Sequence, residues 1–163
     1  MLDQAEQPIW LRFSSLIITQ VSIGALLVAY YAEIIHQLEP CILCIYQRIP
    51  FALAMIFGFI GIFRPTLLKW TLLFAGIAVL VGSGIAIYHV GVEQHWWEAS
   101  CSGELVRKLS TTSFLEELQK KPIKSCDELE WVFFGVSMAT YNVFYSLALS
   151  TFCFLGFNKL RGS

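Results

Sequence analysis

The sequence has few charged side chains, and they are unevenly spread along the chain. Charged residues make up 14% of the 163 residues, whereas a soluble domain carries roughly 25%. The net charge is only -1, so the chain lacks the basic face that a nucleic-acid partner requires. Apolar residues make up 56%, and the length suits a single domain. This composition excludes an ordinary soluble domain and indicates that much of the chain faces something other than water.

Four long stretches of the chain contain no charge at all. They lie between Arg12 and Glu33, between Arg48 and Arg64, between Lys69 and Glu93, and from Trp131 through Asn158. A membrane-spanning helix needs about 20 largely apolar residues. The second stretch reaches that length only if its helix begins near Cys41 and includes Arg48. We therefore predict an all-α membrane protein, a four-transmembrane-helix bundle forming one domain over residues 1–163, with spans at 14–32, 42–63, 70–91 and 132–157.

The alternative for these stretches is a soluble bundle of four buried helices. Such helices would show polar faces, whereas these stretches are apolar all round, which favours the membrane. The first stretch is also too long for the core of a signal peptide, and no small-residue cleavage site follows it. We therefore expect the first span to be retained.

Lys and Arg are placed asymmetrically around the expected spans. They lie before the first span, between the second and third, and in the tail, at Arg12, Arg64, Lys69, Lys159 and Arg161. The positive-inside rule then predicts that both termini and residues 64–69 are cytoplasmic. The loops at 33–41 and 92–131 would lie on the outer side. The longer loop also carries basic residues, which weaken this assignment without reversing it.

The longer outer loop contains a weak amphipathic pattern over residues 109–123. Ser113 and Glu116 have the spacing of a capping box, and three apolar residues in this segment could share one face. We expect a short helix lying along the membrane surface.

The positions of the five cysteines carry the strongest chemical signal. Cys41 and Cys44 form a C-x-x-C at the outer mouth of the second span, Cys101 and Cys126 lie in the longer outer loop, and only Cys153 lies within a span. The four outer cysteines therefore share one side of the membrane, which is the oxidising side in a bacterium. Two ordinary structural disulfides are one interpretation. A C-x-x-C bridge closes a very short loop and stabilises little, so such pairs are more often redox-active or metal-binding.

The residues around the C-x-x-C favour redox chemistry. Pro40 is suited to a helix start, which would place Cys41 and Cys44 in the first helical turn, where the helix dipole favours the thiolate. Arg48 shares the helix face of both cysteines. An arginine just inside the bilayer is a functional candidate, although it could simply snorkel to the headgroups.

The three histidines differ in their expected depth. His89 lies near the outer end of the third span, at the depth of Arg48, whereas His36 and His95 lie in the loops. A lone histidine at a membrane boundary is often only an interfacial hydrogen-bonding group. We include His89 with Arg48 as the candidate cofactor-binding residues.

At these residues the sequence resembles the DsbB family of membrane disulfide oxidoreductases. The resemblance covers nearly the whole chain and includes the four-span hydropathy. It rests on C-I-L-C-I-Y-Q-R at residues 41–48, on Trp96-Trp97 followed by Cys101, and on Cys126-Asp127-Glu128 followed by Trp131 and Phe134-Gly135. The resemblance implies a multi-pass protein of the bacterial inner membrane, with its outer loops in the periplasm.

The resemblance also implies a relay of electrons through four catalytic cysteines. A reduced periplasmic partner of the DsbA type, which has a thioredoxin fold, would attack Cys101 of a Cys101–Cys126 disulfide. Cys126 would then pass the electrons to the Cys41–Cys44 pair. Cys44 would face a membrane quinone, ubiquinone or menaquinone, with Arg48 beside it. No metal is expected in this scheme.

Two other functions remain open at this point. One is a quinone-linked oxidoreductase resembling the vitamin K epoxide reductase family, although the order of the cysteine pairs favours DsbB. The other is a non-catalytic membrane protein that binds a metal through cysteine and histidine. Its candidate ligands are Cys41, Cys44, His36, His95, Cys101 and Cys126. Cys153 has no part in any of these schemes and is expected to pack as a small apolar residue.

Overall fold

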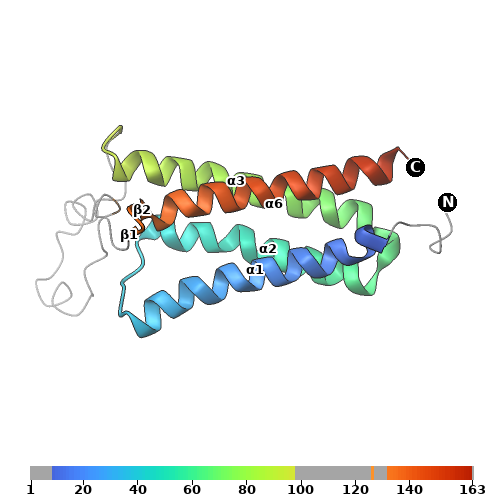
Figure 1. Ribbon diagram of the computed structural model, residues 1–163, viewed down its shortest axis with the longest axis horizontal. Helices are drawn as coiled ribbons and strands as arrows, with labels where there is room; N and C mark the ends of the chain where they lie inside the picture. The colour runs from blue at the N-terminus through green and yellow to red at the C-terminus, as the bar shows by residue number, and fades with distance from the viewer. Residues whose placement is uncertain (1–8, 98–125, 127–131, 163) are drawn as a thin grey trace, which may run out of the picture.

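The computed structural model is a bundle of long helices that run alternately up and down (Figure 1). The structure describes residues 9–97, 126 and 132–162. The four long helices are α1 (Ile9–Ile35), α2 (Ile42–Phe63), α3 (Leu68–Glu93) and α6 (Met138–Arg161). A single 3-10 turn, η2 (Pro65–Leu67), joins α2 to α3. The start of α1 and the end of α6 lie at the same end of the bundle.

All four helices are long and apolar enough to cross a membrane. Their outer surface is apolar as well, since large side chains such as Leu27, Phe63 and Phe144 are more than 60% exposed. In water such a surface would be costly, but against lipid it is favourable. The prediction of an all-α protein with four spans is therefore confirmed.

The last helix begins later than the charge-free run suggested. The expected span began at residue 132, but α6 begins at Met138, after a small antiparallel hairpin of β1 (Val132–Phe133) and β2 (Val136–Ser137). Phe134 and Gly135 form its turn with φ of 50° and 79°, the left-handed conformation that two-residue hairpins favour. The expected surface helix at 109–123 lies outside the described residues.

Small residues let the helices approach one another closely. Helix α3 packs against both α2 and α6, and α1 packs against α2 but barely touches α6. A Cβ atom on Gly82 of α3 would lie only 2.8 Å from the Cβ of Pro50 in α2, and one on Gly76 would lie 3.0 Å from that of Cys153 in α6. Such close contacts supply the van der Waals energy that holds membrane helices together.

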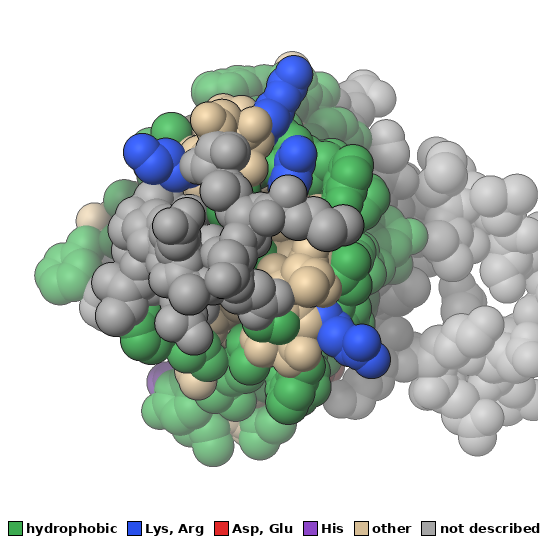
Figure 2. Space-filling model, turned by 90° about the vertical axis from the view of Figure 1, so that its right-hand side faces the viewer, with side chains coloured by type: hydrophobic (Ala, Val, Ile, Leu, Met, Phe, Trp, Pro, Cys, Tyr) green, Lys and Arg blue, Asp and Glu red, His purple; other side chains and the backbone are tan. Residues whose placement is uncertain are grey.

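The two ends of the bundle differ in charge. Figure 2 shows Lys and Arg side chains around the end where α1 begins and α6 ends, with no Asp or Glu among the described atoms in view. The basic residues of this end are Arg64, Lys69, Lys159 and Arg161. At the other end, the described residues include Glu33, Glu39 and Glu93. Among the residues that the structure describes, basic side chains therefore gather at one end of the bundle and acidic side chains at the other.

Candidate functional site

The C-x-x-C lies at the start of α2, at the acidic end of the bundle. Cys41 is the N-cap residue, and its Sγ accepts a hydrogen bond from the backbone N–H of Cys44 at 3.3 Å. Pro40 therefore precedes the helix, and Cys41 caps it, in place of the expected arrangement with Pro40 at the helix start. Neither cysteine is in a disulfide, and their Sγ atoms lie 3.0 Å apart. The capping position brings the Cys41 sulfur to the positive end of the helix dipole.

The surroundings of Cys41 favour its thiolate. The Cys41 side chain is only 3% exposed, and its Sγ lies 3.6 Å from Nε2 of His89 on α3. The hydrogen bond between the Cys41 and Cys44 side chains is the largest cause of a pKa of Cys41 lowered to about 4, and it outweighs the opposing effect of burial. The His89 imidazole and the Cys44 backbone N–H lower the pKa further. Cys41 is thus prepared to act as a thiolate nucleophile or leaving group.

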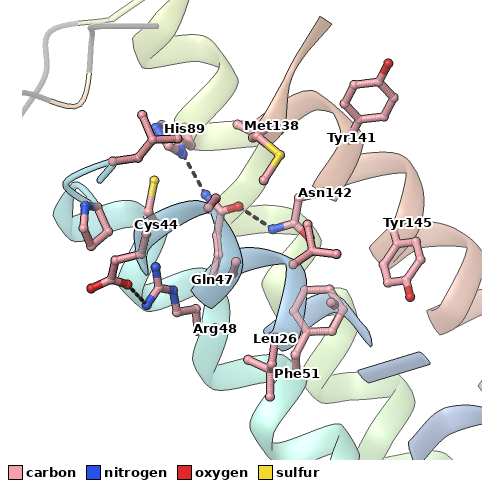
Figure 3. A pocket seen from close by; sticks show the side chains of 18 of the residues that line it. Leu26, Cys44, Gln47, Arg48, Phe51, His89, Met138, Tyr141, Asn142 and Tyr145 are labelled. Carbon is pink, nitrogen blue, oxygen red and sulfur yellow. Dashed lines mark hydrogen bonds and ion pairs between the residues drawn. The ribbon is translucent and has the colours of Figure 1, made fainter. Parts of the chain in front are cut away.

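An amide chain holds His89 in place across three helices (Figure 3). The Gln47 amide nitrogen, from α2, lies 2.7 Å from Nδ1 of His89. Asn142 of α6 donates to the side-chain oxygen of Gln47, and Ser146 donates to Asn142 at 3.0 Å. Neither Gln47 nor Asn142 was among the predicted site residues. Their polarity inside apolar spans was the available signal, since polar residues in a membrane core are functional candidates.

A buried carboxylate lies on the other side of His89. Oε1 of Glu93 is 3.7 Å from Nε2 of His89, and Oε2 of Glu93 accepts a hydrogen bond of 2.6 Å from Ser137. Ser137 also accepts from the backbone N–H of Thr140, so the same hydroxyl caps α6. Glu93 is only 8% exposed. It was not among the predicted site residues, because it was taken as the charge that ends the third span.

Arg48 is held by an ion pair with the first helix. Its guanidinium donates to Oε2 of Glu33 at 2.7 Å and lies 4.7 Å from the centre of the Tyr30 ring. The pair neutralises a charge that would otherwise be costly in a membrane span. Arg48 therefore lies between α1 and α2, on the wall of the same cavity as the cysteines.

A cavity of about 360 Å³ connects these residues. Figure 3 shows Cys44, Gln47, Arg48 and His89 on one side and α6 with Met138, Tyr141, Asn142 and Tyr145 on the other. The wall from α1 is largely apolar, from Gly24 to Ala32, and ends at Glu33. The cavity thus lies between α1 and α6, the two neighbouring helices that contact each other least. Apolar walls with a few polar groups at one end are typical of a small-molecule site.

The remaining predicted residues are placed differently. Cys126 is disulfide-bonded and is buried in one cluster with Cys41, Leu43 and Val92, whereas Cys101 lies outside the described residues. Cys153 is buried in the apolar core.

The histidines of the loops are not part of the described site. His36 and His95 are exposed. Within the described part of the chain, the group that could hold a metal is Cys41, Cys44 and His89, whose ligand atoms lie within 4.8 Å of one another. Of the earlier candidate ligands, the structure therefore gathers the two C-x-x-C thiols, and it adds His89.

Comparison with known proteins assigns the chain to a family. The family model for the disulfide bond formation protein DsbB matches residues 11–156. Disulfide bond formation protein B of Mannheimia succiniciproducens is 30% identical over 152 residues, covering 86% of this chain and 80% of that protein. The protein of the same name from Xanthomonas euvesicatoria pv. vesicatoria is 33% identical over 150 residues, covering 86% and 87%. That from Xylella fastidiosa (strain Temecula1) is 32% identical over 136 residues, covering 78% of each chain.

The match spans all four apolar helices and the C-x-x-C. The chain is accordingly a multi-pass membrane protein with disulfide oxidoreductase activity, and it belongs to the DsbB family of disulfide bond formation proteins.

Proposed function

We propose that this protein reoxidises a periplasmic thiol oxidase of the DsbA type and passes the electrons to a quinone in the bacterial inner membrane. The observation that carries the proposal is the position of the Cys41–Cys44 pair. Cys41 belongs to the same buried cluster as the disulfide-bonded Cys126, and both cysteines of the pair line an apolar cavity between membrane helices. The pair thus lies between a second cysteine pair and a place for a lipid-soluble acceptor.

Electrons enter at the loop disulfide. A thiolate of the partner attacks Sγ of Cys101, which breaks the Cys101–Cys126 bond, forms a mixed disulfide and frees Cys126 as a thiolate. The second partner thiol then resolves the mixed disulfide, so that the partner leaves oxidised and Cys101 is free. The partner has lost two electrons and two protons in this exchange.

Cys126 passes these electrons on to the C-x-x-C. Its thiolate attacks Sγ of Cys41 in a Cys41–Cys44 disulfide, which frees Cys44. Cys101 then displaces Cys41 from Cys126 and restores the loop disulfide. Cys41 is a good leaving group in this exchange because a low thiol pKa favours departure, and the pKa of Cys41 is lowered to about 4.

The cavity residues bind and orient the acceptor. A quinone accepts two electrons and two protons when it becomes a quinol, and this restores the Cys41–Cys44 disulfide. Arg48 places a guanidinium on the cavity wall, where it can donate to a quinone oxygen. His89 lies beside Cys41 and also lines the cavity, so it can carry a proton between the thiol and the acceptor.

The size and position of the cavity suit a ring with a long apolar tail. Its volume of about 360 Å³ falls within the roughly 300 to 1,000 Å³ that small-molecule sites occupy. Because α1 and α6 barely touch along it, an acceptor dissolved in the bilayer can approach from the side. Tyr145 of α6 donates to the Val21 carbonyl of α1 at 2.9 Å, which closes the gap deeper in the membrane.

The charge of the two ends supports the proposed orientation. Arg64, Lys69, Lys159 and Arg161 lie at one end, and basic residues near span ends favour the cytoplasm. Both termini would then be cytoplasmic, with the cysteines at the periplasmic end. Among the earlier alternatives, the DsbB match over residues 11–156 favours this function over one resembling vitamin K epoxide reductases.

The direct test is an anaerobic mixture of the purified protein, a reduced DsbA-type partner and a soluble quinone. We expect the quinone absorbance to fall as the partner becomes oxidised, in equal molar amounts. Oxidised partner without quinone loss, or no oxidation of the partner at all, would overturn the proposal.

The order of the relay has a separate test. With a partner that lacks its resolving cysteine, Cys126→Ser should accumulate a stable intermolecular disulfide through Cys101, and Cys101→Ser should accumulate little. Non-reducing electrophoresis with peptide mapping measures both. Trapping chiefly through Cys126 would reverse the roles of the two loop cysteines.

A further inference from the structure

The reduced C-x-x-C and His89 together present the ligand set of a zinc site. Cys41 and Cys44 supply two sulfurs and His89 supplies Nε2, and these three atoms lie within 4.8 Å of one another. Thiolate and imidazole are the ligands that Zn²⁺ and similar soft divalent cations prefer. All three residues also line the cavity, which leaves one side of the group open.

One of the observed distances matches that of a metal tetrahedron, and a second requires a small movement. With Zn–S of about 2.3 Å and Zn–N of about 2.0 Å, a sulfur and a nitrogen in a tetrahedral site stand about 3.5 Å apart and two sulfurs about 3.8 Å apart. The distance from Cys41 Sγ to His89 Nε2 is 3.6 Å. The two sulfurs are 3.0 Å apart, so they must separate by several tenths of an ångström. Cys44 is less buried than Cys41, and its side chain can supply that movement.

The amide chain behind His89 suits a metal-bound imidazole. A histidine that binds a metal through Nε2 carries its proton on Nδ1 and donates it to a fixed acceptor. Gln47 faces Nδ1 at 2.7 Å, and its side chain can offer either oxygen or nitrogen there. Asn142 beyond it is also an amide, and Ser146 beyond that is a hydroxyl. The whole chain can therefore reverse its donors and acceptors without losing a hydrogen bond.

We propose that the reduced Cys41–Cys44 pair and His89 bind one zinc-class divalent cation, and that this bound cation blocks return of the pair to the disulfide. Binding forms two metal–sulfur bonds and one metal–nitrogen bond and releases any proton still held by the thiols to solvent, with no electron transferred. The oxidised pair offers no thiolate, so it does not bind. The binding follows from the geometry alone, whereas the inhibition rests on the proposed function.

The site has a defined place for a fourth ligand. Three protein ligands with one open position are the arrangement in which zinc keeps a water or another exchangeable ligand. The open position faces the cavity, where the quinone is proposed to bind. Glu93 lies 3.7 Å from Nε2 of His89 but outside the group of three. It therefore adds negative charge near the cation without being required as a ligand.

The test compares one protein in two redox states. Full-length protein in detergent, with Cys101→Ser and Cys126→Ser to remove the other pair, is prepared oxidised or reduced and is dialysed anaerobically against Zn²⁺. We expect about one zinc per chain when reduced and none when oxidised. Cys153→Ala in the same background should bind as its parent does, whereas Cys44→Ser should not bind. Gln47→Leu should weaken binding about 10- to 100-fold, the usual effect of losing a partner of a ligating histidine.

Equal zinc in both redox states, or unchanged binding by Cys44→Ser, would mean adventitious metal and would overturn the site. This comparison uses no quinone and no partner, so its failure is distinct from failure of the proposed function. In a turnover assay with the unmutated protein, Zn²⁺ should slow quinone reduction, and a chelator should restore it. Zinc that binds the reduced pair yet leaves turnover unchanged would overturn the inhibitory role.

Discussion

Cys41 and Cys153 are both buried free cysteines, exposed by 3% and 0%, and they differ in everything around them. Cys41 has a thiol, an imidazole nitrogen and a backbone N–H within reach of its sulfur. Cys153 lies in a core of carbon atoms, with Leu72 and Val79 in the same cluster. Burial alone therefore predicts nothing about a cysteine's role. Polar atoms within reach of the sulfur mark the cysteine that can become a thiolate.

The middle of the bundle and its end near Cys41 differ in the same way, in how polar their buried side chains are. The middle is mainly apolar and buries only small hydroxyl groups such as Ser83 and Ser150, whereas the end near Cys41 contains buried Gln47, His89 and Glu93. Gln47 and His89 bond to each other across two helices, and Glu93 accepts a hydrogen bond from Ser137, which precedes α6. Such groups are costly inside a membrane unless they are paired. The difference indicates that the polar end is maintained for chemistry and the middle for stability.

The largest expected effect is that of Cys44→Ser. Cys44 lies on the cavity wall together with Arg48, and a hydroxyl cannot join Cys41 in the disulfide whose formation releases two electrons. We expect quinone reduction to fall to background, while capture of the partner through Cys101 persists. Stopped-flow quinone absorbance and non-reducing gels measure the two steps. Turnover close to that of the unmutated protein would show that Cys44 is not required for quinone reduction.

A smaller loss is expected from Arg48→Met. Hydrogen bonds to charged groups contribute about 1.5 to 3 kcal/mol, so the apparent quinone KM should rise roughly 10- to 100-fold. Arg48→Lys should recover only part of this, since a point charge lacks the planar fork.

The matched control for Arg48 is Glu33→Gln. It removes the charge that pairs with Arg48 but keeps an acceptor for the guanidinium, so we expect a smaller change in KM. An unchanged KM in Arg48→Met would show that Arg48 does not bind the quinone and only extends toward the lipid headgroups.

The low pKa of Cys41 can be used to test whether the polar groups around its sulfur stabilise the thiolate. In reduced protein lacking Cys101 and Cys126, thiolate absorbance should appear with a midpoint at about pH 4. Cys44→Ala and His89→Ala each remove a group that lowers the pKa of Cys41, so both should move the midpoint to higher pH. Cys44→Ser keeps a donor and should move it less than Cys44→Ala. A midpoint that stays in place in all three variants would contradict the assigned causes.

The smallest effect should come from Cys153→Ala. The sulfur has only packing partners, so turnover and disulfide content should be normal. Removing it leaves a small void, which costs about 1 kcal/mol of unfolding free energy. Thermal unfolding in detergent measures this cost. A well-folded Cys153→Ala protein without activity would show that the relay includes a fifth cysteine.

The four helices were predictable because length and apolarity alone decide which segments can cross a membrane. The second span, expected at 42–63, is α2, Ile42–Phe63. The start of α6 was not predictable in this way, because the hairpin before Met138 is built largely from apolar residues. Phe134-Gly135 was noted only as part of the resemblance to the DsbB family, and no turn was predicted there.

The site was predictable in part. The C-x-x-C and the depth of His89 pointed to one end of the bundle, and the structure brings Cys41, Cys44 and His89 together. The contacts of Gln47 and Glu93 were not predictable. They depend on how each helix is rotated about its axis, and helices that are apolar all round give no sequence pattern that fixes this rotation.

In the proposed reaction, electrons leave the protein from the Cys41–Cys44 pair and pass to an acceptor in the adjoining cavity. Its most direct test uses reduced protein with Cys101→Ser and Cys126→Ser, mixed anaerobically with a soluble quinone and no partner. Quinone absorbance and thiol counting follow the reaction. We predict one quinol for each chain, together with loss of two thiols and formation of the Cys41–Cys44 disulfide. Quinone that stays oxidised, or quinol that forms while both thiols remain free, would contradict the account.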